Sequence, residues 1–193
     1  MERDHITYTG PAIDDPALFA KLPKGLVDLL QKTNGFIHFH GGLHIRGACL
    51  APAWHALRDA WLGENAFHRL YPDVKPDDIP FAEDCLGDQF LLRDAEVWQL
   101  YAETGEVESL EASFKQFMEE VADDPGEHLG LHPLLQFQRD GGHLKPGQLL
   151  SAHPPFCTEE AEDGVTVTAV ASAERRRFLA EFAAKLRDLP DDG

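Results

Sequence analysis

The sequence predicts an α+β fold: an antiparallel β-sheet flanked by helices, in a single domain with a C-terminal strand–helix extension. Three observations indicate this fold. The 193 residues suit one domain, and 43% of them are hydrophobic, so a sizeable core can form. Short β-like runs follow one another through tight turns, which is typical of an antiparallel sheet. Apolar residues at helical spacing recur before, between and after these runs, so that helices can pack on the sheet.

The first predicted helix begins near Leu22. Pro23 suits its first turn, and Asn34-Gly35 supplies a left-handed stop at its C-terminal end. Four leucines at helical spacing form its apolar stripe. They are Leu22, Leu26, Leu29 and Leu30.

A β-hairpin is predicted next. Residues 36–40 and 43–46 have the composition of two short strands, and Gly41-Gly42 between them is a two-residue turn signal. Pro52 then begins a second predicted helix, which Gly63 ends.

The middle of the chain predicts three more strands, at 79–82, 90–92 and 97–102, with turns between them. An amphipathic helix is expected over 110–121. Residues 127–156 are rich in Gly, Pro and His, and we expect them to be irregular.

The C-terminal part predicts one strand and one helix. Residues 165–170 alternate like a strand, and Ser172 is a good N-cap for a final helix. We expect the buried face of this helix to consist of Phe178, Phe182, Leu186 and Leu189. A lone strand and helix bury too little surface to be stable, so we expect 125–193 to belong to the same folded unit as the rest.

The net charge of −17, from 34 Asp and Glu against 17 Lys and Arg, narrows the classes of partner. Nucleic acids and anionic membranes attract Lys and Arg, so we expect neither as a partner. An acidic surface favours capture of a basic protein. The alternative is that the charge serves solubility alone.

The three cysteines, Cys49, Cys85 and Cys157, are far apart and form no C-x-x-C pair. This pattern suits a reducing compartment, and we expect all three to be buried apolar residues. Met1 to Pro16 lacks the apolar core of a signal peptide, and no run approaches the roughly 18 apolar residues of a membrane helix. We therefore expect a cytoplasmic protein, with no cofactor.

Three histidines lie close together in the predicted hairpin: His38, His40 and His44. Strand alternation would place His38 and His40 on one face, and the turn could bring His44 near them. Three imidazoles can hold zinc with an open fourth position. The more ordinary interpretation, which we favour, is a half-buried strand with no metal.

Glu83, Asp84 and Asp88 form an acidic group around Gly87. Neighbouring carboxylates can divide acid and base roles in catalysis. They can also stabilise a turn by accepting bonds from backbone amides, which we expect here. Gly87 would then supply a backbone angle that a side chain disfavours.

The string IPFAED at 79–84, followed by Gly87-Asp88 and Phe90, resembles the signature of the SUKH superfamily, the Smi–Knr family. Leu22-Pro23, Asn34-Gly35, the strand near Val97 and the helix near Phe114 also resemble this family's pattern. The resemblance covers residues 20–122. We accordingly divide the chain into an N-terminal segment (1–19), a core similar to that family (20–122), and a C-terminal extension (123–193) packed on the same domain.

The resemblance implies an α+β fold without catalytic activity. The family includes yeast cell-wall regulators and many bacterial immunity proteins, which neutralise toxins by binding them. It implies a protein partner, and the charge favours a basic toxin, for example a nuclease. The alternatives are a regulatory or scaffold protein of the same fold, and a metal-dependent enzyme built on the three histidines.

Two groups of residues are singled out by this interpretation. Trp98 and Tyr101 lie on opposite faces of one predicted strand, so at most one of them is free to anchor a partner. The expected partner-binding residues are Glu83, Asp84, Asp88, Trp98 and Tyr101. The expected structural residues are Gly35, Pro80 and Gly87. No catalytic or metal-binding residue is predicted, and the sequence predicts no oligomeric state.

Overall fold

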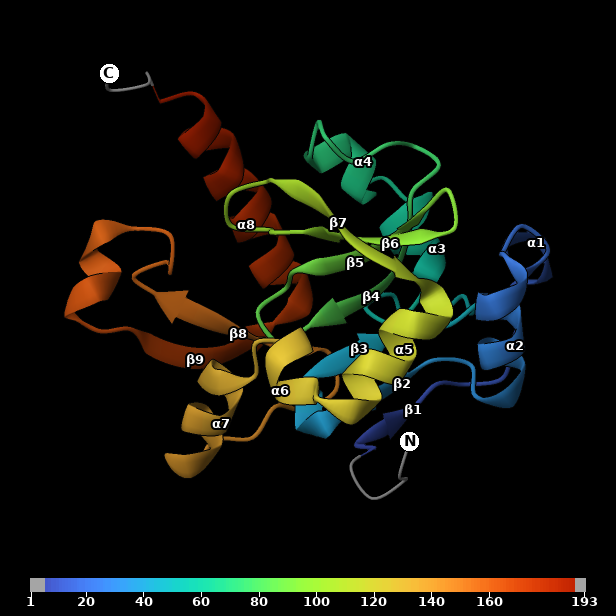
Figure 1. Cartoon of the computed structure of the whole chain (residues 1–193), viewed down its shortest axis with the longest axis horizontal. Coiled ribbons are helices and arrows are strands. Elements are labelled where there is room, and N and C mark those ends of the chain that lie inside the picture. Colours follow the sequence, from blue (N-terminus) through green and yellow to red (C-terminus); the bar gives the residue numbers. More distant parts are fainter. Residues whose placement is uncertain (1–5, 190–193) are drawn as a thin grey trace.

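The computed structural model describes residues 6–189. Residues 1–5 of the predicted N-terminal segment and residues 190–193 of the predicted C-terminal extension lie outside this description. A seven-stranded antiparallel sheet runs through the molecule in the order β1-β2-β3-β4-β5-β6-β7, with each strand beside its neighbour in sequence (Figure 1). The strands of this sheet are β1 (Tyr8–Thr9), β2 (Phe36–His38), β3 (Leu43–Ile45), β4 (Ile79–Asp84), β5 (Gln89–Arg93), β6 (Glu96–Leu100) and β7 (Val107–Ser113).

The helices and a second sheet complete the fold. The α-helices are α1 (Pro16–Phe19), α2 (Lys24–Lys32), α3 (Leu57–Trp61), α4 (Phe67–Leu70), α5 (Phe114–Asp123), α6 (Pro125–His128), α7 (His132–Arg139) and α8 (Ser172–Arg187). The short 3-10 helices are η2 (Phe39–Gly41) and η3 (Glu159–Asp163). The second sheet pairs β8 (Gln148–His153) with β9 (Thr166–Ala171). These elements confirm the predicted single α+β domain with a C-terminal strand and helix.

Both faces of the large sheet are covered, which explains why its central strands are apolar throughout. Side chains of β5 alternate between two clusters: Phe90 packs with α2 and α5, and Leu91 packs with α4 and α8. The second cluster contains Leu179 and Ala183 of α8. Because side chains on a strand point alternately to the two faces, these clusters lie on opposite sides of the sheet.

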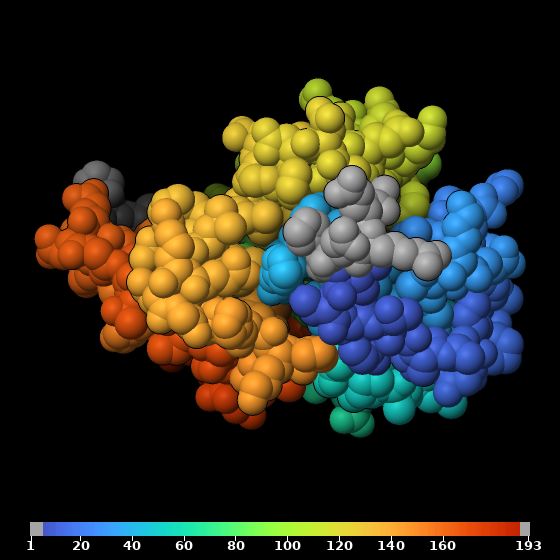
Figure 2. Space-filling model, turned by 90° about the horizontal axis from the view of Figure 1, so that it is seen from below, coloured from blue at the N-terminus to red at the C-terminus, as the bar shows by residue number. Residues whose placement is uncertain are grey.

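The second sheet forms a projection, which we call the tongue (residues 148–171). It is attached to the large sheet by the amide of Leu150, which donates to the carbonyl of Cys85 at 2.8 Å. It packs beside α8 and, seen from below, extends in orange away from the body of the molecule (Figure 2).

The structure contains the predicted first hairpin, but the prediction of its turn was wrong. Phe39 and His40 adopt positive φ angles of 50° and 55°, so β2 ends at His38 and η2 replaces the predicted Gly41-Gly42 turn. His40 therefore does not lie on a strand.

The predicted second helix is much shorter than expected. Only Leu57–Trp61 is helical, because the segment before it pairs with another part of the backbone. The amide of Gly47 donates to the carbonyl of His55, and the amide of Leu57 donates to that of Gly47. Ala56 therefore forms a bridge with Gly47, and the helix begins only at Leu57.

The structure differs from the prediction in two places between residues 107 and 156. Residues up to Ser113 form β7, and α5 begins at Phe114 rather than at residue 110. Ser113 and Gln116 form a reciprocal capping box there, which fixes the helix start. The stretch 127–156 is not irregular throughout, since it contains α7 and β8.

The predicted buried face of the last helix is also wrong. Phe178 and Leu189 are exposed, whereas Arg175, Leu179 and Ala183 are buried. The buried residues Arg175, Leu179 and Ala183 follow one another at a spacing of four and form one stripe of the helix, and Phe178 lies outside this stripe. Ser172 lies inside the helix, with Ala171 as N-cap.

Within residues 6–189, no helix is both long enough and apolar enough to cross a bilayer. Cys49 and Cys85 are buried as expected, but Cys157, on the tongue, is exposed.

Candidate functional site

Glu83 stands at the centre of a buried network of charged and polar side chains. It lies on β4 and is 1% exposed. His44 Nδ1 lies 2.9 Å from its Oε1, and Arg46 Nη2 donates to its Oε2 at 2.9 Å. Arg176 of α8 donates to both carboxylate oxygens, through Nε and Nη2. We call these residues, with His55 and Gln89, the Glu83 network.

The two arginines decide the charge of Glu83. Burial would raise the pKa of this carboxyl, but Arg176 and Arg46, together with His44, hold the pKa well below its usual range. Burial lowers the pKa of Arg46 to about 9, which still leaves it a cation at neutral pH. The centre of the network is therefore an ionised carboxylate between two guanidinium groups, an arrangement that is stable only while each charge keeps its partners.

A chain of two imidazoles continues from Glu83. His44 Nε2 lies 2.8 Å from His55 Nδ1, and His55 Nε2 lies 3.1 Å from the carbonyl oxygen of Asn34. Both ends of this chain, the Glu83 carboxylate and the Asn34 carbonyl, only accept hydrogen bonds. Three links between two accepting ends need three protons, but two neutral imidazoles carry two.

Burial lowers the pKa of His44 and lowers that of His55 to about 4, so the pair is neutral near pH 7. One of the three links then lacks its proton. The Glu83 network is thus a structural cluster in which the histidine chain is the weakest part.

In the acidic group around Gly87, Asp84 accepts bonds from backbone amides, the role expected for one of these carboxylates. Asp84 Oδ1 accepts from the amides of Leu86, Gly87 and Asp88 at 2.8–3.0 Å. Gly87 has a φ of +104°, and a Cβ there would lie 2.8 Å from Leu179 Cδ1. This turn therefore requires both the carboxylate and the glycine.

The other two structural residues also make close contacts. Gly35 has a φ of +76°, and a Cβ there would lie 2.6 Å from the carbonyl oxygen of Ile45. Pro80 lies at an irregularity of β4, and its carbonyl accepts from Arg46 Nη1 at 2.8 Å.

Two of the five expected partner-binding residues are in the wrong place for that role. Glu83 and Asp84 are buried, and the bonds described above occupy both oxygens of Glu83 and Oδ1 of Asp84, so they are not surface contacts. Trp98 is half-buried on the α8 side of the sheet, with the Arg93 guanidinium 4.4 Å above its ring. Asp88 and Tyr101 line a pocket.

The three hairpin histidines do not converge, which contradicts the geometry needed for the metal hypothesis. His44 lies opposite Ile37 in the hairpin, whereas His38 lies opposite Leu43, so His38 and His44 point to different faces. Over residues 6–189, no group of three or more His, Cys, Asp or Glu side chains is placed to hold a metal ion.

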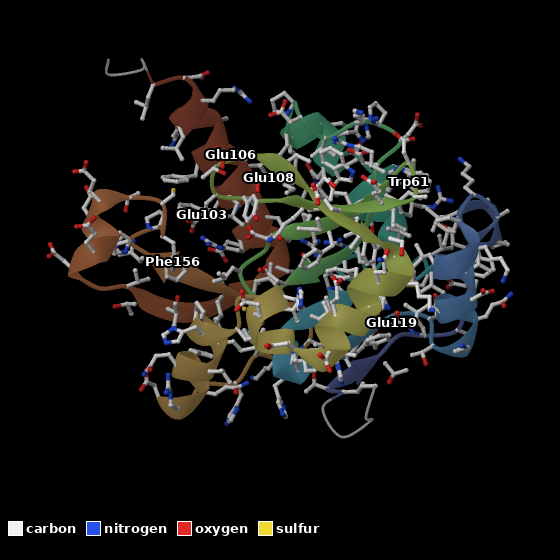
Figure 3. The ribbon with its side chains drawn as sticks, viewed as in Figure 1. Trp61, Glu103, Glu106, Glu108, Glu119 and Phe156 are labelled. Carbon is white, nitrogen blue, oxygen red and sulfur yellow. The ribbon has the colours of Figure 1, made fainter. Side chains whose placement is uncertain are left out.

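An open pocket of about 360 Å³ lies between the large sheet, α8 and the tongue. We call it the acidic pocket. It is lined by Leu86, Asp88, Tyr101, Glu103, Thr104, Pro133, Phe156, Cys157 and Arg175. Figure 3 shows Glu103 and Phe156 at this side of the molecule, with Glu106 and Glu108 beyond Glu103 and with Trp61 and Glu119 away from it.

Contacts between loops fix the shape of this pocket. Arg175 Nη2 donates to Glu103 Oε1 at 3.1 Å, and the amide of Cys157 donates to Glu103 Oε2 at 3.3 Å. Glu103 therefore joins α8 to the tongue. Phe156 beside it is 41% exposed. Burial and the Glu103 carboxylate raise the pKa of Asp88 to about 6.

The comparisons with known proteins show the fold and nothing more. No family model matches this chain, and no curated protein sequence matches it. The crystal structure of Atu4351 from Agrobacterium tumefaciens is similar. Its TM-score is 0.56 at 13% identity, over 91% of this chain and 85% of that one. The resemblance to the Smi–Knr family stays a prediction.

Sequence reasoning missed most residues of both sites. In the Glu83 network it missed His55, Arg46 and Arg176, and in the acidic pocket it missed Glu103 and Phe156. Arg46 offered one signal, since a charged residue directly after a buried strand calls for a buried partner. The others come together only through tertiary packing, which no local pattern indicates.

Proposed function

We propose that this chain is a non-catalytic protein-binding domain, and specifically an immunity protein that neutralises a basic toxin by binding it. The observation that carries this proposal is the acidic pocket, in which exposed aromatic surface and carboxylates lie together on one side of the molecule. Exposed aromatic side chains are typical anchors of protein interfaces, and surrounding charge selects and steers the partner.

The surroundings of the pocket extend its negative charge. Glu106 and Glu108 at the start of β7 are exposed. On the tongue, η3 and its surroundings carry four more exposed acids: Glu159, Glu160, Glu162 and Asp163. A basic protein that approaches this side meets acids from both walls, which raises its association rate at low ionic strength.

The resemblance of residues 79–90 to the Smi–Knr signature supports the same function from the sequence. The structure adds a physical reason for this string: Glu83 and Asp84 hold the core together, so the resemblance concerns the scaffold. The partner would then be selected by surface residues outside the string, which fits an immunity family whose members meet different toxins.

The test is co-expression with the toxin encoded by the gene beside that of this protein, in cells that the toxin alone kills. We expect growth to be restored and a stoichiometric complex to be purified. Growth without a complex, or a complex without protection, would contradict neutralisation by binding. A harmless neighbour that binds tightly would favour the regulatory alternative instead.

A further inference from the structure

We infer that the acidic pocket binds a lysine or arginine side chain from a loop of the partner protein, together with a main-chain carbonyl of that loop. The inference rests on the proposed function, because it names where and how the partner is held. Four features of the pocket lead to it.

The first feature is a donor without an acceptor. Arg175 is 1% exposed, and its Nε and Nη2 donate to the Leu86 carbonyl and to Glu103 at 3.3 and 3.1 Å. Its Nη1 is buried and has no hydrogen-bond partner among the described residues. Buried donors are nearly always satisfied, since an unmade bond is costly. Because Arg175 lines the pocket, a bound acceptor can complete it.

The second feature is the excess of negative charge. Asp88 and Glu103 line the pocket with Arg175, so two carboxylates face one guanidinium group. The Glu103 side chain is 14% exposed, so its charge is only partly screened by water. A cation placed between these carboxylates would balance the site. It would also relieve the unfavourable ionisation of Asp88, whose pKa is raised to about 6 by burial and by Glu103.

The third feature decides which acceptor fits Arg175. A ligand carboxylate or phosphate would satisfy Nη1, but it would also meet the like charges of Asp88 and Glu103. A neutral peptide carbonyl accepts the same bond without this repulsion. One peptide segment with a basic side chain therefore supplies both groups, the carbonyl for Arg175 and the cation for the acids.

The fourth feature is the apolar wall. Tyr101 and Phe156 line the pocket from the sheet and from the tongue. Aromatic rings of this kind pack against the methylene stems of Lys and Arg and attract their cationic ends. The cavity of about 360 Å³ lies near the lower end of the range of roughly 300–1,000 Å³ that is usual for ligand sites. It suits one long side chain rather than a large ligand.

The first experiment uses capped tripeptides as probes and the full chain labelled with ¹⁵N. N-acetyl-Gly-Arg-Gly-amide and its Lys counterpart should shift the amide resonances of residues 101–104 and 156–158. The peptides with norleucine or Glu in the central position should not. Equal binding of the norleucine peptide, or shifts confined to another surface, would overturn the inference.

The second experiment compares matched variants. Glu103→Gln keeps the shape of the side chain and removes its charge, and Glu119→Gln makes the same change on α5, away from the pocket (Figure 3). Phe156→Ala removes a partly exposed ring from the pocket wall, and Leu50→Ala removes an exposed apolar side chain outside the pocket. We expect at least about tenfold weaker binding of the Arg peptide for the two pocket variants, and less than about twofold for the two controls. Equal effects of Glu103→Gln and Glu119→Gln, with Phe156→Ala unchanged, would show that only overall charge matters.

The same variants separate this inference from the proposed function. If the toxin is bound and neutralised, but neither Glu103→Gln nor Phe156→Ala weakens the complex, the immunity function stands and the pocket inference fails. If the Arg peptide binds the pocket but the toxin does not bind the protein, the proposed function fails and the pocket remains a site for basic peptides.

Discussion

Arg176 of α8 donates through Nε and Nη2 to the two carboxylate oxygens of Glu83 of β4, across 93 positions of the sequence. The pair joins the last helix to the centre of the large sheet, where Glu83 also receives Arg46 and His44. The two guanidinium groups reach Glu83 from different parts of the fold, Arg46 from the end of β3 and Arg176 from α8. The buried charge of Glu83 is therefore compensated fully only when the sheet and the C-terminal helix are assembled together.

Replacing Arg176 by Met should lower the free energy of unfolding by about 1–3 kcal/mol, because Glu83 keeps its buried charge and loses its bidentate partner. The figure is below that of a fully buried pair because the Arg176 side chain is 16% exposed. The measurement is urea unfolding followed by circular dichroism. Arg177→Met, at an exposed position one residue later, should change stability by less than about 0.5 kcal/mol. Equal stabilities of the two variants would contradict a structural role for the pair.

Acid should destabilise the protein through the histidine chain. Burial lowers the pKa of His55 from 6.5 to about 4, and that of His44 in the same direction. A lowered folded pKa means that the unfolded state binds protons first. The stabilisation is then complete above pH 6.5 and is lost as the pH falls towards 4.

The test is His55→Gln, which cannot take up a proton in this range. Its stability should depend less on pH than that of the wild type. The stability difference between the two proteins should narrow by about 2–3 kcal/mol between pH 6.5 and 4. Parallel stability curves for wild type and variant would mean that other groups govern the acid response.

Asp88 should show the opposite dependence. Its pKa is raised from 3.8 to about 6, so the folded state disfavours the ionised carboxylate, and this cost appears as the pH rises through 6. Asp88→Asn keeps an oxygen for the amide of Ala102 and removes the charge. We expect it to be more stable than wild type by about 1 kcal/mol at pH 7.5, with the gain absent at pH 4. Thermal unfolding at the two pH values measures this, with the exposed Asp163→Asn as control. A gain of the same size at both pH values would exclude ionisation as its cause.

Gly87→Ala should be distinctly destabilising, by about 2–4 kcal/mol, because it adds a Cβ 2.8 Å from Leu179 Cδ1 at a φ of +104°. Gly130→Ala is a suitable comparison, since Gly130 has a positive φ of 56° with no atom within 4 Å of its added Cβ. That variant should cost about 1–2 kcal/mol from backbone strain alone. If the two costs are equal, neither the contact with Leu179 nor the larger φ of Gly87 adds to the cost.

Binding of a basic toxin should depend on salt mainly through its association rate. Raising the ionic strength from about 0.05 to 0.5 M shortens the Debye length to a few Å, so long-range attraction from the acids of the tongue and β7 is largely lost. Dissociation should change much less, because it is controlled by buried aromatic contacts. Surface plasmon resonance distinguishes the two rates. If the association rate does not change with salt concentration, the net negative charge of the protein serves solubility alone.

The sequence predicted the parts of the fold that local patterns control. The strands around residues 79–84 and 97–102, the turn at Gly87 and the existence of a last helix follow from alternation, glycine placement and periodicity. The errors occurred where tertiary contacts override such patterns. Phe178 was expected in the buried face of α8, yet that face is formed by Arg175, Leu179 and Ala183, which pack in the folded chain.

The functional site was harder to predict than the fold for the same reason. Asp88 and Tyr101 were expected to contact a partner and do line the acidic pocket, but its other walls come from the tongue and α8. Loops that are distant in sequence form the pocket, so no spacing of residue types could indicate it. Glu83 and Asp84 were expected both to stabilise the turn and to contact a partner, because a sequence does not show which carboxylates are buried and paired.

The position of Arg176 in the last helix also has a consequence for synthesis of the chain on the ribosome. Glu83 is made long before Arg176, so until α8 emerges Arg46 is the only guanidinium group of the network available to the carboxylate, beside the neutral His44. A nascent chain that closed its sheet early would bury this anion without its strongest partner. Early closure of the sheet therefore costs free energy, and this cost is removed only once α8, which also completes the acidic pocket, has been made.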